Sequence, residues 1–338
     1  MKHLKTLAKT LFVFGLLYFL TQKGFISVQD TKRAFDSWPM LLLVFFVLGI
    51  QVIFGALRWQ WLLQAQSIEL KLLRVLELTA VGNFFNIALP GAVSGDFIKA
   101  FYIGKDIPGQ RARAFGGILF DRVAGLSALV LIGAGAMILG YESNPDGANA
   151  HMLQVLRPLM LLAAACTIVF YAYLFLVKET WDPVLILIRK LEKALPAKLG
   201  KAVSSIGRIY EGLRHYHNHR LTVIKALSIS LVVHMCVGWA FLEFAYAFGA
   251  DHLSLLSVYT IFPLGLLVTA VPVAPAGLGT GHAAFHYLFN LIGCARGADI
   301  FTLYALSQLF YGFVGGIVYL RFKGQLQPVS SPQTSAAN

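Results

Sequence analysis

The sequence predicts an all-α fold, a polytopic transmembrane helical bundle with about six full spans and two re-entrant helical hairpins. Apolar residues make up 57% of the 338 residues and charged residues only 13%, whereas soluble proteins carry roughly 25% charged residues. Apolar stretches of about 20 residues recur, and this length matches a hydrocarbon layer about 30 Å thick. Two further apolar regions are interrupted near their centres by proline and glycine.

Six uninterrupted apolar segments are long enough to cross a bilayer as helices. They lie at about 4–22, 40–64, 114–140, 152–177, 221–248 and 299–321. The first has the basic start and apolar core of a signal peptide but no clear A-x-A cleavage site. Because more apolar segments follow it, we expect an uncleaved first helix.

The two interrupted regions lie at about 72–103 and 255–292. The first is broken between Leu89 and Asp96 and the second between Pro272 and Gly281. Proline removes a backbone donor and glycine weakens the preference for helix, so neither region should form one straight helix. We expect each region to dip into the membrane and return on the same side.

The distribution of the net charge of +12 supports this topology. With two re-entrant segments, every strongly basic loop falls on one side, which the positive-inside rule makes the cytoplasm. The 178–220 connection, with nine Lys or Arg against four acids, lies there. A full crossing at either broken region would move this connection or the basic end of the last helix to the other side. Both termini are therefore predicted to be cytoplasmic.

The same topology makes the two hairpins enter from opposite sides of the membrane. Their sequences are weakly alike, since Pro90, Gly95 and Phe101 are spaced much like Pro275, Gly279 or Gly281, and Phe285. Opposed broken hairpins indicate two inverted halves, a plan that places a binding site near the bilayer midplane. The alternative is that any two Pro-Gly breaks look similar.

The organisation is predicted as one transmembrane domain, 1–323, followed by a polar, disordered cytoplasmic tail, 324–338. Within the domain, the 178–220 connection has apolar residues at helical spacing among basic ones, so it should lie along the cytoplasmic interface. The alternating histidines, His215, His217 and His219, fit a solvated basic turn better than a metal site. No CxxC pair occurs among the three cysteines, so neither a disulfide framework nor a zinc site is supported.

Ionisable residues inside the apolar segments are the candidates for a mechanism, because each costs about 2.5–3.5 kcal/mol on insertion scales. They are Asp96, Lys99, Asp121, Arg122 and Glu243, with Arg58 nearer the interface.

Asp96 follows the first break, where the free N–H groups and positive dipole of a helix start stabilise an acid. It is either a helix cap or a gate, proton or cation site. The N–H groups from Gly91 to Gly95 could equally face a phosphate. Lys99 lies three residues after Asp96, so it either pairs with that acid or contacts a lipid phosphate.

Asp121 and Arg122 are adjacent and point in different directions, so one or both should find partners on other helices. Asp121 could form a structural bridge, for example with Lys99. A guanidinium matches a phosphate well, which makes Arg122 a candidate for binding one.

The second break offers Thr280, His282 and His286. The two histidines have metal-ligand spacing, but HExxH is absent and no carboxylate is near in sequence, so a headgroup contact, proton sensitivity or polar packing is favoured over a metal. Asn83, Asn86 and Gln308 could add hydrogen bonds within the bundle. No GxSxG, Walker or dinucleotide motif is present. We therefore expect no catalytic residues, metal, cofactor or nucleic-acid partner.

Three motifs in the sequence resemble those of a known protein family. They are Gly82-Asn83-Phe84-Phe85-Asn86 through Pro90 to Gly95-Asp96-Phe97-Ile98-Lys99, then Phe120-Asp121-Arg122, then Pro275-Ala276-Gly277-Leu278-Gly279. In order and spacing they resemble the lysylphosphatidylglycerol synthase transmembrane region family, also described as flippase-like or UPF0104 proteins.

The resemblance implies a polytopic protein of the inner membrane that moves or binds lipids. It does not imply synthase activity, because in the synthases a separate soluble domain makes the aminoacyl lipid and this chain ends about 15 residues after the last helix. The family often has an acid where this chain has His282, so a substrate or coupling ion of relatives is not carried over.

The predicted function is translocation of a lipid-like amphiphile. An anionic phosphate headgroup is favoured, and a polyprenyl-linked phosphate is one form of it. The alternatives are a membrane enzyme acting on a lipid phosphate, in which Asp96 and His282 meet, and a non-transporting partner of a synthase or glycosyltransferase. The predicted substrate-binding residues are Arg58, Asn83, Asn86, Pro90, Gly91, Gly95, Asp96, Lys99, Asp121, Arg122, Pro275, Gly277, Gly279, Thr280 and His282.

Overall fold

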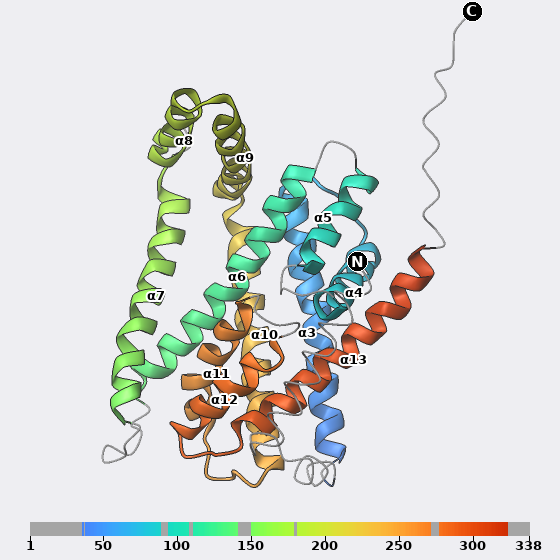
Figure 1. Ribbon diagram of the computed structural model, residues 1–338, viewed down its shortest axis with the longest axis vertical. Helices are drawn as coiled ribbons and strands as arrows, with labels where there is room; N and C mark the ends of the chain where they lie inside the picture. The colour runs from blue at the N-terminus through green and yellow to red at the C-terminus, as the bar shows by residue number, and fades with distance from the viewer. Residues whose placement is uncertain are drawn as a thin grey trace, which may run out of the picture.

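The computed structural model of the chain is a helical bundle (Figure 1). It describes residues 36, 38–88, 94–107, 111–140, 150–178, 181–271 and 277–323, and within these ranges the chain forms helices and no strand. The predicted first span, 4–22, and the predicted tail, 324–338, lie outside the described residues.

Five long helices confirm five of the predicted spans. They are α3 (Trp38–Ala65), α6 (Arg111–Ile138), α7 (Ala150–Leu176), α10 (Arg220–Ala247) and α13 (Gly297–Lys323). Each has 27 or 28 residues, so at 1.5 Å per residue each is about 40 Å long and exceeds the hydrocarbon thickness. Large apolar side chains such as Phe46, Val169 and Leu320 are exposed on their outer faces, as expected for helices in contact with lipid.

Both interrupted regions form helical hairpins. The first consists of α4 (Leu72–Ala88) and α5 (Ser94–Asp106), and the second of α11 (Leu255–Ala270) and α12 (Thr280–Asn290). The two helices of each pair pack against each other. The hairpins lie toward opposite ends of the bundle (Figure 1), as the topology predicts. That each hairpin dips into the membrane and returns on the same side stays a prediction.

A glycine brings the helices of the first hairpin into contact. A Cβ atom on Gly95 would lie 2.1 Å from the carbonyl oxygen of Gly82, so only glycine allows the start of α5 to approach α4 this closely. The Asn86 side-chain oxygen accepts a hydrogen bond of 2.8 Å from the Gly95 N–H. This bond satisfies one of the free donors at the helix start.

The order and packing of the helices agree with two inverted halves. Each half consists of a long helix, a hairpin and another long helix: α3, α4–α5 and α6, then α10, α11–α12 and α13. The first long helices, α3 and α10, pack together. Each hairpin also packs against the last helix of the other half, since α4 lies on α13 and α11 lies on α6.

The connection between the halves contains α7, α8 (Pro183–Ala194), α9 (Ala197–Arg214) and a short 3-10 helix, η3 (His215–His219). A buried ion pair of 2.7 Å joins the guanidinium of Arg214 to Asp182, directly before α8. Tyr173 and Tyr210 donate hydrogen bonds of 2.7 and 3.0 Å to the same carboxylate. Arg214 also donates to the carbonyl of Leu174 at 3.1 Å, so this network fastens α8 and α9 to the end of α7.

Two of the three histidines of η3 bond to backbone carbonyl groups. His215 Nε2 lies 2.9 Å from the carbonyl oxygen of Ala65, and His217 Nδ1 lies 2.9 Å from that of Leu174. These bonds connect η3 to the ends of α3 and α7.

Candidate functional site

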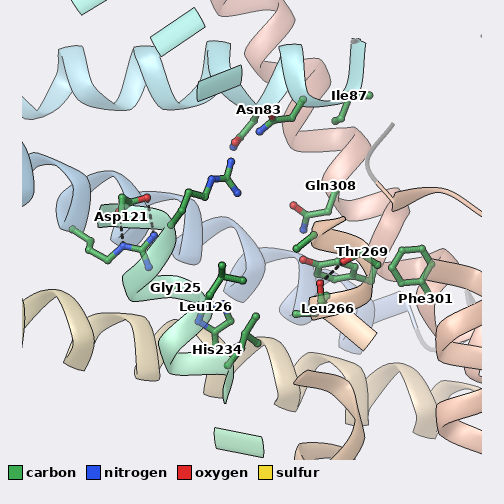
Figure 2. A pocket seen from close by; sticks show the side chains of 16 residues that line it. Asn83, Ile87, Asp121, Gly125, Leu126, His234, Leu266, Thr269, Phe301 and Gln308 are labelled. Carbon is green, nitrogen blue, oxygen red and sulfur yellow. Dashed lines mark hydrogen bonds and ion pairs between the residues drawn. The ribbon is translucent and has the colours of Figure 1, made fainter. Parts of the chain in front are cut away.

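A polar cavity of about 320 Å³ opens inside the bundle (Figure 2). Its walls come from α3, α4, α6, α10, α11 and α13. Asn86 and Ile87 line it directly before the first break, and Thr269 and Ala270 line it directly before the second. The cavity therefore lies where the two hairpins approach each other, near the middle of the long helices. Its lining residues are Arg58, Asn83, Asn86, Ile87, Asp121, Arg122, Gly125, Leu126, Leu129, His234, Leu266, Thr269, Ala270, Phe301, Tyr304 and Gln308.

Arg58 on α3 and Asp121 on α6 form a two-pronged ion pair in the cavity wall. Nε and Nη2 of Arg58 donate to the two carboxylate oxygens at 2.6 and 2.9 Å. The remaining Nη1 donates to the hydroxyl of Ser230 on α10 at 2.7 Å. Parallel guanidinium–carboxylate bonds fix both partners, so this pair joins three helices. Sequence analysis had offered Lys99 as a partner for Asp121, and the structure shows Arg58 instead.

Asp96, in the first turn of α5, is the centre of a second charge cluster. Its carboxylate accepts a bond of 2.7 Å from Arg122 Nε, and Lys99 Nζ lies 3.6 Å from its other oxygen. The Asp96 side chain is only 3% exposed. Two nearby cations and the positive end of α5 compensate the cost of burying this carboxylate. The predicted pairing of Lys99 with Asp96 is thus present.

Lys99 passes through a narrow passage to reach Asp96. A Cβ atom on Gly82 would lie 2.5 Å from its Cε, so α4 leaves just enough room for the lysine chain. Its ammonium group lies 4.9 Å from the ring centre of Trp59 on α3, a distance at which a cation is attracted to an aromatic face. Lys99 therefore contacts α3, α4 and its own helix.

The two clusters together carry an excess of positive charge. Three cations, Arg58, Lys99 and Arg122, are joined to two carboxylates, Asp96 and Asp121. One positive charge is left unbalanced within this set. The Arg122 side chain lines the cavity and is 44% exposed, compared with 12% for Arg58 and 11% for Lys99. Arg122 is therefore the most exposed of the three cations.

Neutral hydrogen-bonding side chains also line the cavity, beside apolar residues such as Leu126, Leu266 and Phe301. Asn83, His234, Thr269 and Gln308 surround the space in Figure 2, and the lining also includes Tyr304. Sequence analysis did not assign His234, Thr269 or Tyr304 to the site. A single polar residue in an apolar span gives no pattern, so the only available signal was its polarity.

The described residues predicted at the second break shape the start of α12, and none of them lines the cavity. Gly277 and Gly279 have φ angles of 69° and 85°, a left-handed backbone that glycine adopts without strain. Thr280 donates to the carbonyl of Gly277 at 3.2 Å. His282 Nδ1 accepts the Gly279 N–H at 3.1 Å, and its ring meets the ring of Phe301 edge-on.

Phe301 is also part of the cavity wall, so His282 supports the site from behind. Asp96 and His282, the pair expected to meet in an enzyme, thus have separate partners among the described residues. Gly95 serves the contact between α4 and α5. Pro90, Gly91 and Pro275 lie outside the described residues.

Comparison with known proteins identifies the family of this chain. The model of the family described as "Lysylphosphatidylglycerol synthase TM region" matches residues 6–318. The chain belongs to this family. Its relatives include a UPF0104 membrane protein from Pyrococcus horikoshii, 22% identical over 296 residues that cover 83% of this chain and 86% of the relative. Another, from Methanothermobacter thermautotrophicus, is 22% identical over 287 residues that cover 82% and 83%. No solved structure matches the chain significantly.

Membership in the lysylphosphatidylglycerol synthase transmembrane region family agrees with the fold. The described residues include five helices that are long and apolar enough to cross a membrane. The chain is therefore a multi-pass membrane protein of a lipid-related family.

Proposed function

We propose that this protein binds a membrane lipid by an anionic phosphate headgroup and moves that headgroup between the two leaflets. The observation that carries the proposal is a group of three cations and two carboxylates beside a cavity between the two hairpins, with the Arg122 side chain in the cavity lining. A headgroup in this cavity would lie near the bilayer midplane while its apolar chains stay in the surrounding lipid. Broken helices from inverted halves form the binding sites of many transporters.

The charges favour a phosphate. A guanidinium presents donors in a fixed fork that matches phosphate oxygens, and it is less strongly hydrated than an ammonium group. Arg122 uses Nε for Asp96. Lys99, held on the other oxygen of Asp96, adds to the positive potential from behind.

The position of the basic connection supports one orientation of the protein in the membrane. The basic connection that contains α8 and α9 lies at one end of the bundle (Figure 1). The positive-inside rule places this end on the cytoplasmic side of the inner membrane. The first hairpin would then open toward the cytoplasm and the second toward the outside.

The test is the lipid that remains bound to the purified protein, measured by native mass spectrometry. Arg122→Ala and Lys99→Ala should each lose an anionic lipid while the protein stays monodisperse. Arg189→Ala is a matched control, because Arg189 is 68% exposed and lies on α8. Unchanged lipid content in both of these variants would contradict the assigned site.

Transport itself is tested in liposomes that contain a fluorescent phospholipid in both leaflets. The wild-type protein should make the outer and inner pools exchange, with no chemical change in the lipid, and Arg122→Ala should slow this exchange. A chemically altered lipid would instead favour an enzyme. Absence of exchange, together with co-purification of a synthase or glycosyltransferase, would favour a partner subunit.

A further inference from the structure

A groove separate from the polar cavity lies where α7 meets α8 and α9 (Figure 1). Its volume is about 630 Å³, within the range of about 300–1,000 Å³ that is usual for ligand pockets. Seven of its lining residues lie on α7, between Leu162 and Leu174, and the others lie on α8 and α9. Among the described residues, the linings of this α7 groove and of the polar cavity share no member.

The α7 side of the groove is one face of a membrane-spanning helix. Its lining residues recur in every turn from Leu162 to Leu174, as expected for a single helical face. Twelve positions at 1.5 Å each make this face about 18 Å long. One leaflet is about as thick, since it is half of a hydrocarbon layer of about 30 Å. Ala165 and Cys166, near the middle of the face, carry small side chains and leave room beside the helix.

The α9 side of the groove is apolar although it contains a tyrosine and an arginine. The hydroxyl of Tyr210 donates a hydrogen bond of 3.0 Å to Asp182, and that of Tyr173 donates one of 2.7 Å to the same carboxylate. Arg214 pairs with this carboxylate and also donates to the carbonyl of Leu174. Because the polar ends bind one another, the rings and the apolar part of the arginine side chain are left to line the groove.

The groove is continuous with the lipid-facing surface of the bundle. Leu162 and Val169 in its wall are 61% and 66% exposed, and Cys166 is exposed as well. An apolar space of this kind does not hold water, which finds no hydrogen-bonding partners there. An empty groove would lose the dispersion contacts of its walls. An apolar chain from the surrounding lipid avoids both costs.

Cations lie at the end of the groove that adjoins α8. Lys178 comes four positions after Leu174, directly beyond the end of α7, and is exposed. Arg189 and Lys190 on α8 are exposed too. Basic residues beside a membrane surface attract anionic headgroups. A phospholipid could therefore place its phosphate at this end and one acyl chain along α7.

From these observations we infer that the α7 groove holds one acyl chain of a phospholipid from the leaflet beside α8 and α9. The bound chain would pack against α7 and α9 together and brace the junction between them. The inference does not depend on the proposed transport, because the groove and the polar cavity have separate linings.

Photo-crosslinking in liposomes tests the inference. The full-length protein is reconstituted into phosphatidylglycerol and phosphatidylethanolamine that contain a small share of phosphatidylcholine with a diazirine in the middle of one acyl chain. After illumination, mass spectrometry of peptides compares the label on the groove segment of α7 with that on a lipid-facing control segment of α13, around Phe313, which is 69% exposed. We expect severalfold more label on α7, because a chain held in the groove exchanges more slowly than a chain in bulk lipid.

Two variants connect the label to the groove. Cys166→Trp and Ala165→Phe each place a ring in the groove and should lower the label on α7 to the level of the control segment. Ile168→Trp adds the same indole ring to α7 at a position that is 61% exposed and outside the lining, so it should keep the wild-type label. The melting temperature in detergent shows that each variant is folded. Equal label on α7 and α13 in the wild-type protein would overturn the inference, and so would wild-type label in both filled variants.

Arg122→Ala separates this inference from the proposed function. Arg122 lines the polar cavity and not the groove, so its replacement should slow lipid exchange and leave the label on α7 unchanged. Loss of that label in Arg122→Ala would mean that cavity and groove hold the same lipid, and a separate site would be refuted. Selective label on α7 without any lipid exchange by the wild-type protein would refute transport and leave the groove site standing.

Discussion

Arg58 and Asp121 lie 63 positions apart in the chain and form two hydrogen bonds of 2.6 and 2.9 Å across the wall of the cavity. Their side chains are 12% and 15% exposed. Removing one member of a buried pair leaves the other charge uncompensated, whereas replacing both members with apolar residues leaves no uncompensated charge.

Asp121→Asn should therefore lower the stability of the folded protein by about 3 kcal/mol, because Arg58 keeps its charge without a carboxylate. Thermal unfolding in detergent measures the effect. The double variant Arg58→Met, Asp121→Leu should recover most of the loss. A melting temperature of Asp121→Asn equal to that of the wild type would mean that the pair is not formed.

Gly95→Ala should destabilise the first hairpin. The added methyl group would lie 2.1 Å from the carbonyl oxygen of Gly82, and overpacking of this kind costs about 1–3 kcal/mol. The melting temperature and the lipid content should both fall. Gly135→Ala is the matched control, because nothing lies within 4 Å of its new Cβ; in a helix this change is expected to be neutral or to stabilise by up to about 1 kcal/mol. Equal behaviour of the two variants would contradict the close contact of α4 and α5.

The Asp182 network predicts a pH dependence at the end of α7. Burial raises the pKa of the Asp182 carboxyl, but the hydrogen bonds it accepts and the charge of Arg214 outweigh burial, so the pKa lies below its ordinary value of 3.8. A carboxylate with a lowered pKa stabilises the fold fully above its unfolded pKa, about 3.9, and this contribution is lost as the pH falls through the folded pKa.

Asp182→Asn should accordingly lower the melting temperature at pH 7 and lower it progressively less once the pH falls below about 4. The measurement is the difference in melting temperature between wild type and variant from pH 7 to pH 3. Glu211→Gln is a suitable control, because Glu211 is 51% exposed and its ion pair is at the surface. A difference that stays constant over the whole range would show that the carboxylate charge does not stabilise the network.

The orientation can be tested with single cysteines in a background in which Cys166, Cys236 and Cys294 are all replaced by serine. The two substitutions are Lys193→Cys, on α8, and Asp251→Cys, between α10 and α11. These segments lie at opposite ends of the bundle (Figure 1). An impermeant maleimide added to intact cells with a permeabilised outer envelope should label the second and not the first. Labelling of both positions from the same side would refute the topology.

The long helices and the hairpins could be predicted from the sequence because they depend on local pattern. The lengths of the apolar runs gave the spans, and proline and glycine marked the breaks. The charge distribution then required both hairpins to be re-entrant. Each of these arguments uses neighbouring residues only, or sums charge over a loop.

The partners inside the site could not be predicted in the same way. Asp121 lies next to Arg122 in sequence, yet it binds Arg58 because α3 and α6 pack side by side. Arg122 instead reaches Asp96 on α5. Such pairings depend on how helices rotate against each other, which a single sequence does not specify. For the same reason His234 and Tyr304 could not be distinguished from polar residues that serve packing alone.

The exchange of hairpins between the two halves has a mechanical consequence. Because α4 lies on α13 and α11 lies on α6, neither hairpin can tilt without pushing a long helix of the opposite half. If the protein moves a headgroup as proposed, a tilt of one hairpin would therefore also displace a helix of the opposite half. A sequence of motions in which one entrance closes while the other opens needs no additional linkage in such a molecule.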